Sequence, residues 1–309
     1  MEWLKMKKTF KKIFKIFKGS FKGFLDDNAM KLSASLAYYT IFSLGPLLII
    51  IMTVVSFFFG REAVQGKVYG QIKGLVGSDA ALQIQQIIKN IESSDQHSFG
   101  AMLGISMLII GATVIFTEIQ DSINFIWSVK AKPKKGWLKY LRNRLLSFSL
   151  IVSLGFLLLV SLLVSSLLDL LSERLKIIFA DYTVFIFYVV NMIIVFFVIT
   201  GLFAVIFKVL PDAKIRWKDA LVGAGFTALL FIIGKFLIGF YLGNSQLGAT
   251  YGAAASIMIL FVWVYYSAII LYFGAEFTKA YAMESGDGIQ PTDTAVFIIK
   301  EETREVPMA

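Results

Sequence analysis

Residues 251–277 read YGAAASIMILFVWVYYSAIILYFGAEF and contain one charged residue, Glu276. The hydrocarbon core of a bilayer is about 30 Å thick, and about 20 residues of α-helix cross it. Because hydrocarbon offers the backbone no hydrogen bonds, only helices and closed barrels span it. This stretch is apolar and long enough for the first solution, so it predicts a transmembrane helix.

Five further stretches of the same kind precede it, so we predict an all-α, polytopic membrane protein with six transmembrane helices. The predicted spans are Leu32–Gly60, Phe99–Phe125, Leu145–Leu168, Tyr182–Phe207, Ala220–Leu242 and Tyr251–Phe277. The composition agrees, since 17% of the residues are charged, against about 25% in soluble proteins. We expect a basic N-terminal segment (residues 1–31), a transmembrane domain (residues 32–283, with an outer loop at 61–98) and a flexible cytoplasmic tail (residues 284–309).

The basic residues between the spans predict the orientation, because loops rich in Lys and Arg stay in the cytoplasm. Nine lysines precede the first span, seven basic residues follow the second, and four follow the fourth. The connections on the other side carry four, two and none. We therefore expect a multi-pass protein of the cytoplasmic membrane with both termini in the cytoplasm.

Residues 9–25 have the pattern of an amphipathic helix that lies in the membrane interface. Phenylalanines recur every three or four residues on one face and lysines fill the other. We expect the lysines to contact anionic lipid headgroups, above all Lys11, Lys15, Lys18 and Lys22. Such a helix either only anchors the first span or also gathers a lipid substrate, and the pattern leaves both roles open.

Polar side chains follow one face of the first two spans and recur in the sixth. By their helical spacing and depth, we hypothesise that they line one cavity open toward the inner leaflet, where carboxylates would exchange protons or bind a cation. The residues are Ser35, Tyr39, Ser43, Pro46, Thr117, Glu118, Asp121, Tyr272 and Glu276. Alternatively, the acids pair with the basic loops at Lys130–Arg144 and Lys214–Lys218 and only fasten the helices together.

Two groups of motifs carry a resemblance to a known family. One begins at Val209-Leu-Pro-Asp-Ala-Lys-Ile-Arg-Trp217 and continues through Tyr251-Gly252 to Gly274-Ala-Glu276-Phe277. The other is Leu36-Ala-Tyr-Tyr-Thr40 with Ser43 and Pro46. Over roughly residues 20–283 the chain resembles the YihY/BrkB family. The resemblance implies a six-helix protein of the bacterial cytoplasmic membrane, in a family linked to envelope lipids and virulence and formerly labelled a ribonuclease.

The residues argue against catalysis. The chain has no cysteine and one histidine, His97, so it lacks the usual ligands of a metal site and the acid–base pair that RNA hydrolysis needs. We expect no metal, no cofactor, no enzymatic activity and no nucleic-acid partner. The net charge of +9 is explained by anionic membrane lipids, the expected partners.

Two functions remain open after catalysis is set aside. One is a transporter or flippase of a lipid-like envelope amphiphile; because no phosphate-binding loop is present, it would work without its own ATPase. The other is a non-transporting membrane scaffold or envelope-assembly factor. The sequence does not indicate an oligomeric state.

Overall fold

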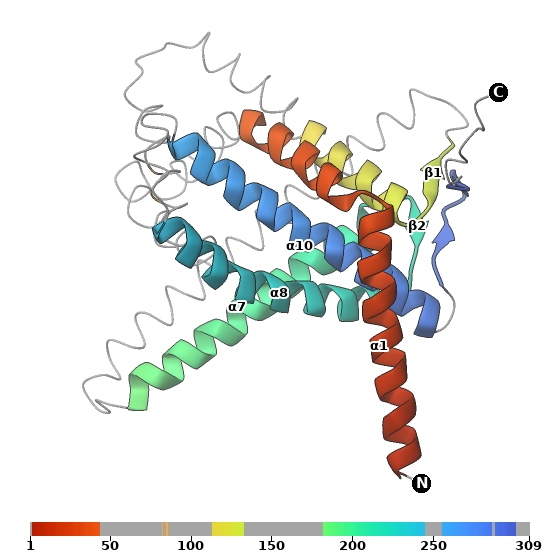
Figure 1. The fold of residues 1–309 in the computed structure, drawn as a ribbon, viewed down its shortest axis with the longest axis horizontal. Helices are drawn as coiled ribbons and strands as arrows, with labels where there is room; N and C mark the ends of the chain where they lie inside the picture. The colour runs from red at the N-terminus through yellow and green to blue at the C-terminus, as the bar shows by residue number, and fades with distance from the viewer. Residues whose placement is uncertain are drawn as a thin grey trace, which may run out of the picture.

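Figure 1 shows the computed structural model, which describes residues 2–43, 82, 85, 113–132, 182–244, 255–285 and 288–300. Within these residues, three helices are long and apolar enough to cross a membrane: Met192–Val209, Trp217–Leu242 and Ile257–Ser285. They correspond to the fourth, fifth and sixth predicted spans. The third predicted span lies outside the described residues. The first and second lie only partly within them, as does the outer loop at 61–98.

The N-terminal helix α1 (Glu2–Asp26) ends at a tight turn. Asn28 has φ 51°, a left-handed conformation that Asn tolerates better than most residues. Its N–H donates a hydrogen bond to the Leu25 carbonyl at 3.1 Å. A second helix, residues 29–43, begins directly after this turn. The N-terminal half of α1 projects away from the other helices (Figure 1).

The C-terminal half of α1 lies antiparallel to helix α10 (Ala255–Ser285). Lys15 is paired with Glu284 at 2.8 Å, and further along the helix the Phe24 and Phe273 ring centroids are 5.7 Å apart. The face of α1 toward α10 is buried and carries Ile16, Ser20 and Phe24, and Asp27 in the turn after α1 is buried as well. A second apolar face stays exposed and carries Phe10, Ile13, Phe14, Phe21 and Leu25.

Helices α7 (Tyr182–Val209) and α8 (Trp217–Gly243) form a hairpin. Their shared core contains Phe203 and Phe231, whose ring centroids are 6.0 Å apart. The far side of α8 exposes large apolar residues, among them Phe236, Leu237 and Phe240. Apolar side chains on both faces of a helix are expected when hydrocarbon rather than water surrounds the bundle.

Helices α8 and α10 pack through a matched pair of glycines and threonines. Residues 223–227 read GAGFT and residues 274–278 read GAEFT. A Cβ on Gly223 would overlap the Thr278 hydroxyl, and a Cβ on Gly274 would overlap the Thr227 hydroxyl. Each threonine donates to the carbonyl of the glycine in its own helix at 2.7 Å. The two antiparallel helices therefore contact each other through the same five-residue pattern, which brings their backbones close together.

Four short strands lie together at one end of the bundle, which we call the strand end. Strand β1 (Val129–Ala131) pairs antiparallel with β4 (Ala295–Phe297), and β2 (Ala213–Lys214) pairs with β3 (Gln290–Pro291). Strands β3 and β4 belong to residues 288–300, which we call the C-terminal strap. The strap crosses both the loop between α7 and α8 and the segment after helix 113–126 (Figure 1).

Residues 288–300 of the predicted tail form the strap, with its two short strands. The sixth helix also continues beyond the predicted end at Phe277 to Ser285. The additional turns leave the apolar stretch but pack against α1, which explains why they stay helical. The remaining tail residues, 286–287 and 301–309, lie outside the described residues.

Candidate functional site

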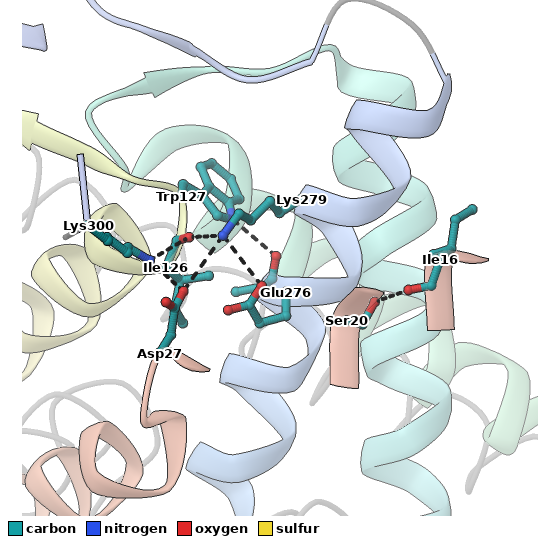
Figure 2. A network of polar contacts seen from close by, with 9 residues as sticks. Ile16, Ser20, Asp27, Ile126, Trp127, Glu276, Lys279 and Lys300 are labelled. Carbon is teal, nitrogen blue, oxygen red and sulfur yellow. Dashed lines mark hydrogen bonds and ion pairs between the residues drawn. The ribbon is translucent and has the colours of Figure 1, made fainter. Parts of the chain in front are cut away.

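Four charged side chains meet at the strand end, and we call Asp27, Glu276, Lys279 and Lys300 the ionic cluster. They come from three parts of the fold: the turn after α1, two positions one turn apart on α10, and the end of the strap. Figure 2 shows them pointing toward one another. The cluster therefore joins the two ends of the chain to the last transmembrane helix.

Asp27 accepts contacts from both lysines. Lys300 Nζ lies 2.6 Å from Asp27 Oδ2, and Lys279 Nζ lies 3.7 Å from the same oxygen. Lys279 Nζ is also 3.7 Å from Glu276 Oε2. By formal charge, the two carboxyl groups and the two ammonium groups balance, and such compensation is the condition for keeping ionised groups in a buried place.

The last carbonyl groups of helix 113–126 complete the site. Lys279 Nζ donates to the Ile126 carbonyl at 2.5 Å, and Lys300 Nζ lies 3.5 Å from the same oxygen. Helix C-termini carry partial negative charge and unpaired carbonyls, so they attract cations. The next residue, Trp127, donates its indole N–H to the Ala275 carbonyl at 3.0 Å and fastens this helix end to α10.

Lys300 has the most exposed side chain of the ionic cluster. Its side chain is 27% exposed, against 6% for Asp27. Burial lowers the pKa of Lys300 below its ordinary value; the hydrogen bond to Asp27 opposes that shift and the charge of Lys279 adds to it. Within the described residues, the strap thus places a partly desolvated ammonium between two carboxylates and a helix end.

Three buried polar atoms of α10 have no hydrogen-bond partner in the structure: the Ser285 hydroxyl at the end of the helix and, within the site, Glu276 Oε1 and the Tyr272 hydroxyl. Glu276 is 2% exposed and Tyr272 is fully buried. Unpaired buried polar atoms are rare because each costs about 1–3 kcal/mol. Tyr272 and Glu276 lie one turn apart on the face of α10 that also carries Lys279.

A second polar network fastens helix 113–126 to the loop between α7 and α8. Asn124 donates to Asp212 Oδ2 at 3.0 Å and accepts the Asp212 backbone N–H at 2.8 Å. Gln120 donates to the same carboxylate at 3.2 Å. Nearby, Arg216 pairs with the buried Asp219 at 2.8 Å. Every group named here has a partner, which indicates a structural role.

The predicted cavity residues separate into three groups. Tyr272, Glu276 and Ser43 are buried, and Ser35 and Glu118 are half-buried. Tyr39, Thr117 and Asp121 are exposed. Pro46 lies outside the described residues. One cavity shared by these residues stays a prediction.

Sequence reasoning missed Asp27, Lys279 and Lys300 as partners of Glu276. Lys279 had a signal, since it follows Glu276 by three residues on a helix. Asp27 and Lys300 are separated by almost the whole chain, so no spacing rule joins them. The alternative hypothesis paired the acidic residues with the loops Lys130–Arg144 and Lys214–Lys218. The lysines in contact with Asp27 and Glu276 are instead Lys279 and Lys300, which lie outside both loops.

The described residues hold no group of three or more His, Asp or Glu side chains arranged for a metal ion. The four lysines predicted to contact lipid headgroups are exposed on α1: Lys11, Lys15, Lys18 and Lys22. Lys15 is also paired with Glu284. The site therefore consists of a charge-balanced cluster, an unpaired carboxylate oxygen and an exposed basic helix beside it.

Comparison with known proteins gives a consistent result. The family model described as "Virulence factor BrkB" matches residues 20–296. A "UPF0761 membrane protein" of Psychromonas ingrahamii is 30% identical over 82% of this chain and 82% of its own length. Another, of Pseudoalteromonas atlantica, is 30% identical over 79% and 78%. One from Saccharophagus degradans is 27% identical over 87% of this chain but only 60% of its own length. No solved structure matches.

Proposed function

The chain is a membrane protein of the virulence factor BrkB family, and we propose that it moves a lipid-like amphiphile across the cytoplasmic membrane. Six helices would span the bilayer, with the strand end and both termini in the cytoplasm. The basic loops and the excess of lysines before the first span support this orientation.

Glu276 is the observation that carries the proposal. It is a buried carboxylate with one unpaired oxygen, in a helix that is otherwise apolar enough to cross a membrane. Ionisable residues inside membrane helices are expensive and mark transport pathways more often than packing sites. Its neighbours Asp27, Lys279 and Lys300 give the cluster two charge-balanced arrangements, because binding a proton or cation at one carboxylate releases an ammonium from it.

Helix α1 would bring the amphiphile to this site. Its exposed phenylalanines would enter the acyl boundary of the inner leaflet while the lysines contact anionic headgroups. The same helix covers Glu276, since Gly23 lies against its carboxylate. The proposed path therefore runs from the membrane surface along α1 to the ionic cluster.

The alternative is a non-transporting membrane scaffold. The matched Gly and Thr contacts of α8 and α10 favour it, because close backbone packing of this kind stabilises helix pairs without any transport role. A scaffold also needs charge-balanced polar contacts, which the ionic cluster supplies equally well. The two functions differ in what the purified protein does to lipids.

Reconstitution into lipid vesicles distinguishes a transporter from a scaffold. The protein is placed in vesicles that carry a trace of fluorescent lipid in both leaflets, and an impermeant reductant is added outside. A transporter lets the reductant remove more than the outer half of the fluorescence. A scaffold leaves the inner half intact, as in protein-free vesicles, and that result would overturn the proposal.

A further inference from the structure

The surroundings of the Lys300 ammonium have the chemistry of a binding site. Asp27 Oδ2 accepts a hydrogen bond at 2.6 Å, the Ile126 carbonyl lies at 3.5 Å, and the Phe125 ring centroid lies at 4.4 Å. A carboxylate, a carbonyl and an aromatic face are the groups that recognise a primary ammonium, because they satisfy its N–H donors and its charge together.

A further acceptor at this site is unused. Glu276 is 2% exposed, lies beside Asp27 and Lys279, and leaves Oε1 without a hydrogen-bond partner. Figure 2 shows its carboxylate directed toward Asp27 and Lys279. A single lysine at the end of the strap does not satisfy every acceptor of the site.

Lys300 is attached through weak local structure. The strap is paired through the two residues of β3 and the three residues of β4, and ladders this short contribute little stability. Beside the strands, three further backbone hydrogen bonds hold it, one each at Thr292, Thr294 and Ile298. Phe125 is 40% exposed, so the site has an open side. The strap can therefore leave without disturbing the contacts of α8 with α10.

From these contacts we infer that Asp27, Ile126 and Phe125 form an exchangeable ammonium site, in which the strap's Lys300 is displaced by a primary ammonium group of an amphiphile headgroup. The exchange keeps the charge of the ionic cluster, because one ammonium replaces another. The choice of an amphiphile as ligand rests on the proposed function, whereas the ammonium chemistry follows from the site alone.

A spin label on the strap would detect the exchange. The chain has no cysteine, so Ile299→Cys, at a position 91% exposed, accepts a single spin label next to Lys300. The full chain is reconstituted in vesicles of phosphatidylcholine alone, or of phosphatidylcholine and phosphatidylethanolamine in equal parts. Phosphatidylcholine has a quaternary ammonium that cannot donate hydrogen bonds, so we expect the mobile fraction of the label to rise several-fold only with phosphatidylethanolamine.

Two variants separate exchange from general loosening of the strap. In Lys300→Gln there is no ammonium to displace, so the label should be mobile in both lipids and insensitive to phosphatidylethanolamine. Lys214→Gln removes the strap's exposed ion pair with Asp293 (2.6 Å) and should keep the lipid response of the parent.

Soluble ethanolamine, added to the phosphatidylcholine vesicles, identifies the source of the ammonium. Displacement by ethanolamine supports the site with a free amine as ligand, and displacement by phosphatidylethanolamine alone supports it with a lipid headgroup. A label that responds to neither amine, or a Lys300→Gln variant that responds as the parent does, would overturn the inference. Strap release without lipid translocation would leave the ammonium site standing and remove only the proposed function.

Discussion

Gly23 of α1 lies against Glu276 of α10 so closely that a Cβ on Gly23 would be 2.5 Å from Oε2 and 2.9 Å from Cδ. The backbone of α1 therefore covers the buried carboxylate directly, without a side chain between them. Any movement of α1 at the membrane surface reaches Glu276 through this contact. The arrangement connects the basic helix to the ionic cluster.

The first prediction concerns this contact. Gly23→Ala should lower the free energy of unfolding by about 1–3 kcal/mol, because the new methyl group overlaps a carboxylate that is buried and cannot move away freely. The matched control is Gly225→Ala on α8, where a Cβ meets nothing within 4 Å; alanine should be neutral or stabilise the helix by about 1 kcal/mol. Denaturant titration in micelles measures both, and equal effects would show that Gly23 makes no special contact.

The second prediction concerns the matched contact of α8 and α10. Gly274→Ala should destabilise the protein because its Cβ overlaps the Thr227 side chain. Thr227→Ala removes the overlapping hydroxyl and methyl, so the double variant should recover part of the loss, with a coupling energy of about 0.5–3 kcal/mol. Strictly additive effects in the double-mutant cycle would contradict the close approach of the two helices.

Hydropathy predicted the three described spans closely. The fourth and fifth were predicted to within three residues at each end, as comparison of Tyr182–Phe207 with α7 and of Ala220–Leu242 with α8 shows. A run of apolar residues is a local signal, so single-sequence reasoning finds it. The sixth helix ends eight residues later than predicted, at Ser285, because contacts with α1 rather than hydropathy keep its last turns helical.

The strap and the ionic cluster could not be predicted in the same way. Strands of two and three residues have no periodicity to recognise. Asp27 and Lys300 meet only because α1, α10 and the strap pack together, which is a tertiary relation. Glu276 itself was predicted as a site residue, since a carboxylate in an apolar helix stands out in the sequence. Its partners did not stand out, because lysines are common near the ends of membrane helices.

The third prediction concerns the placement of α1 on the membrane. Phe10 is 71% exposed on the apolar face, whereas Lys12 lies on the opposite side of the helix. A fluorophore attached to Phe10→Cys should be quenched by lipids that carry a quencher in their acyl chains, and the same fluorophore at Lys12→Cys should not. Equal quenching at both positions would show that α1 does not lie in the interface.

The fourth prediction concerns the charge of that helix. Each lysine near an anionic membrane surface contributes about 1 kcal/mol, reduced by salt. A peptide of residues 1–25 should become helical on anionic vesicles and remain largely unfolded with neutral ones, as circular dichroism would show. Replacing Lys11, Lys18 and Lys22, three of the peptide's eight lysines, with Gln should weaken this preference by about 3 kcal/mol before screening by salt. A peptide that binds both kinds of vesicle equally would contradict the electrostatic part of the account.

The fifth prediction concerns topology. Single cysteines at Ser94, in the proposed outer loop, and at Ile299, in the strap, should lie on opposite sides of the membrane. In intact cells an impermeant thiol reagent should label Ser94→Cys only, and both positions should react after the membrane is opened. Labelling of Ile299→Cys in intact cells would place the strand end outside and reverse the proposed orientation.

Lipid translocation by Glu276→Gln in reconstituted vesicles decides whether the buried carboxylate takes part in transport. Glutamine keeps the size of the side chain and removes its charge, so the helix should form while the ionic cluster loses its charge balance. The control is Glu284→Gln, the same change on the same helix at a surface ion pair with Lys15, which contributes little to stability. We predict that Glu276→Gln inserts and folds but loses most translocation, whereas Glu284→Gln translocates as the parent does. Unchanged translocation by Glu276→Gln would contradict the account.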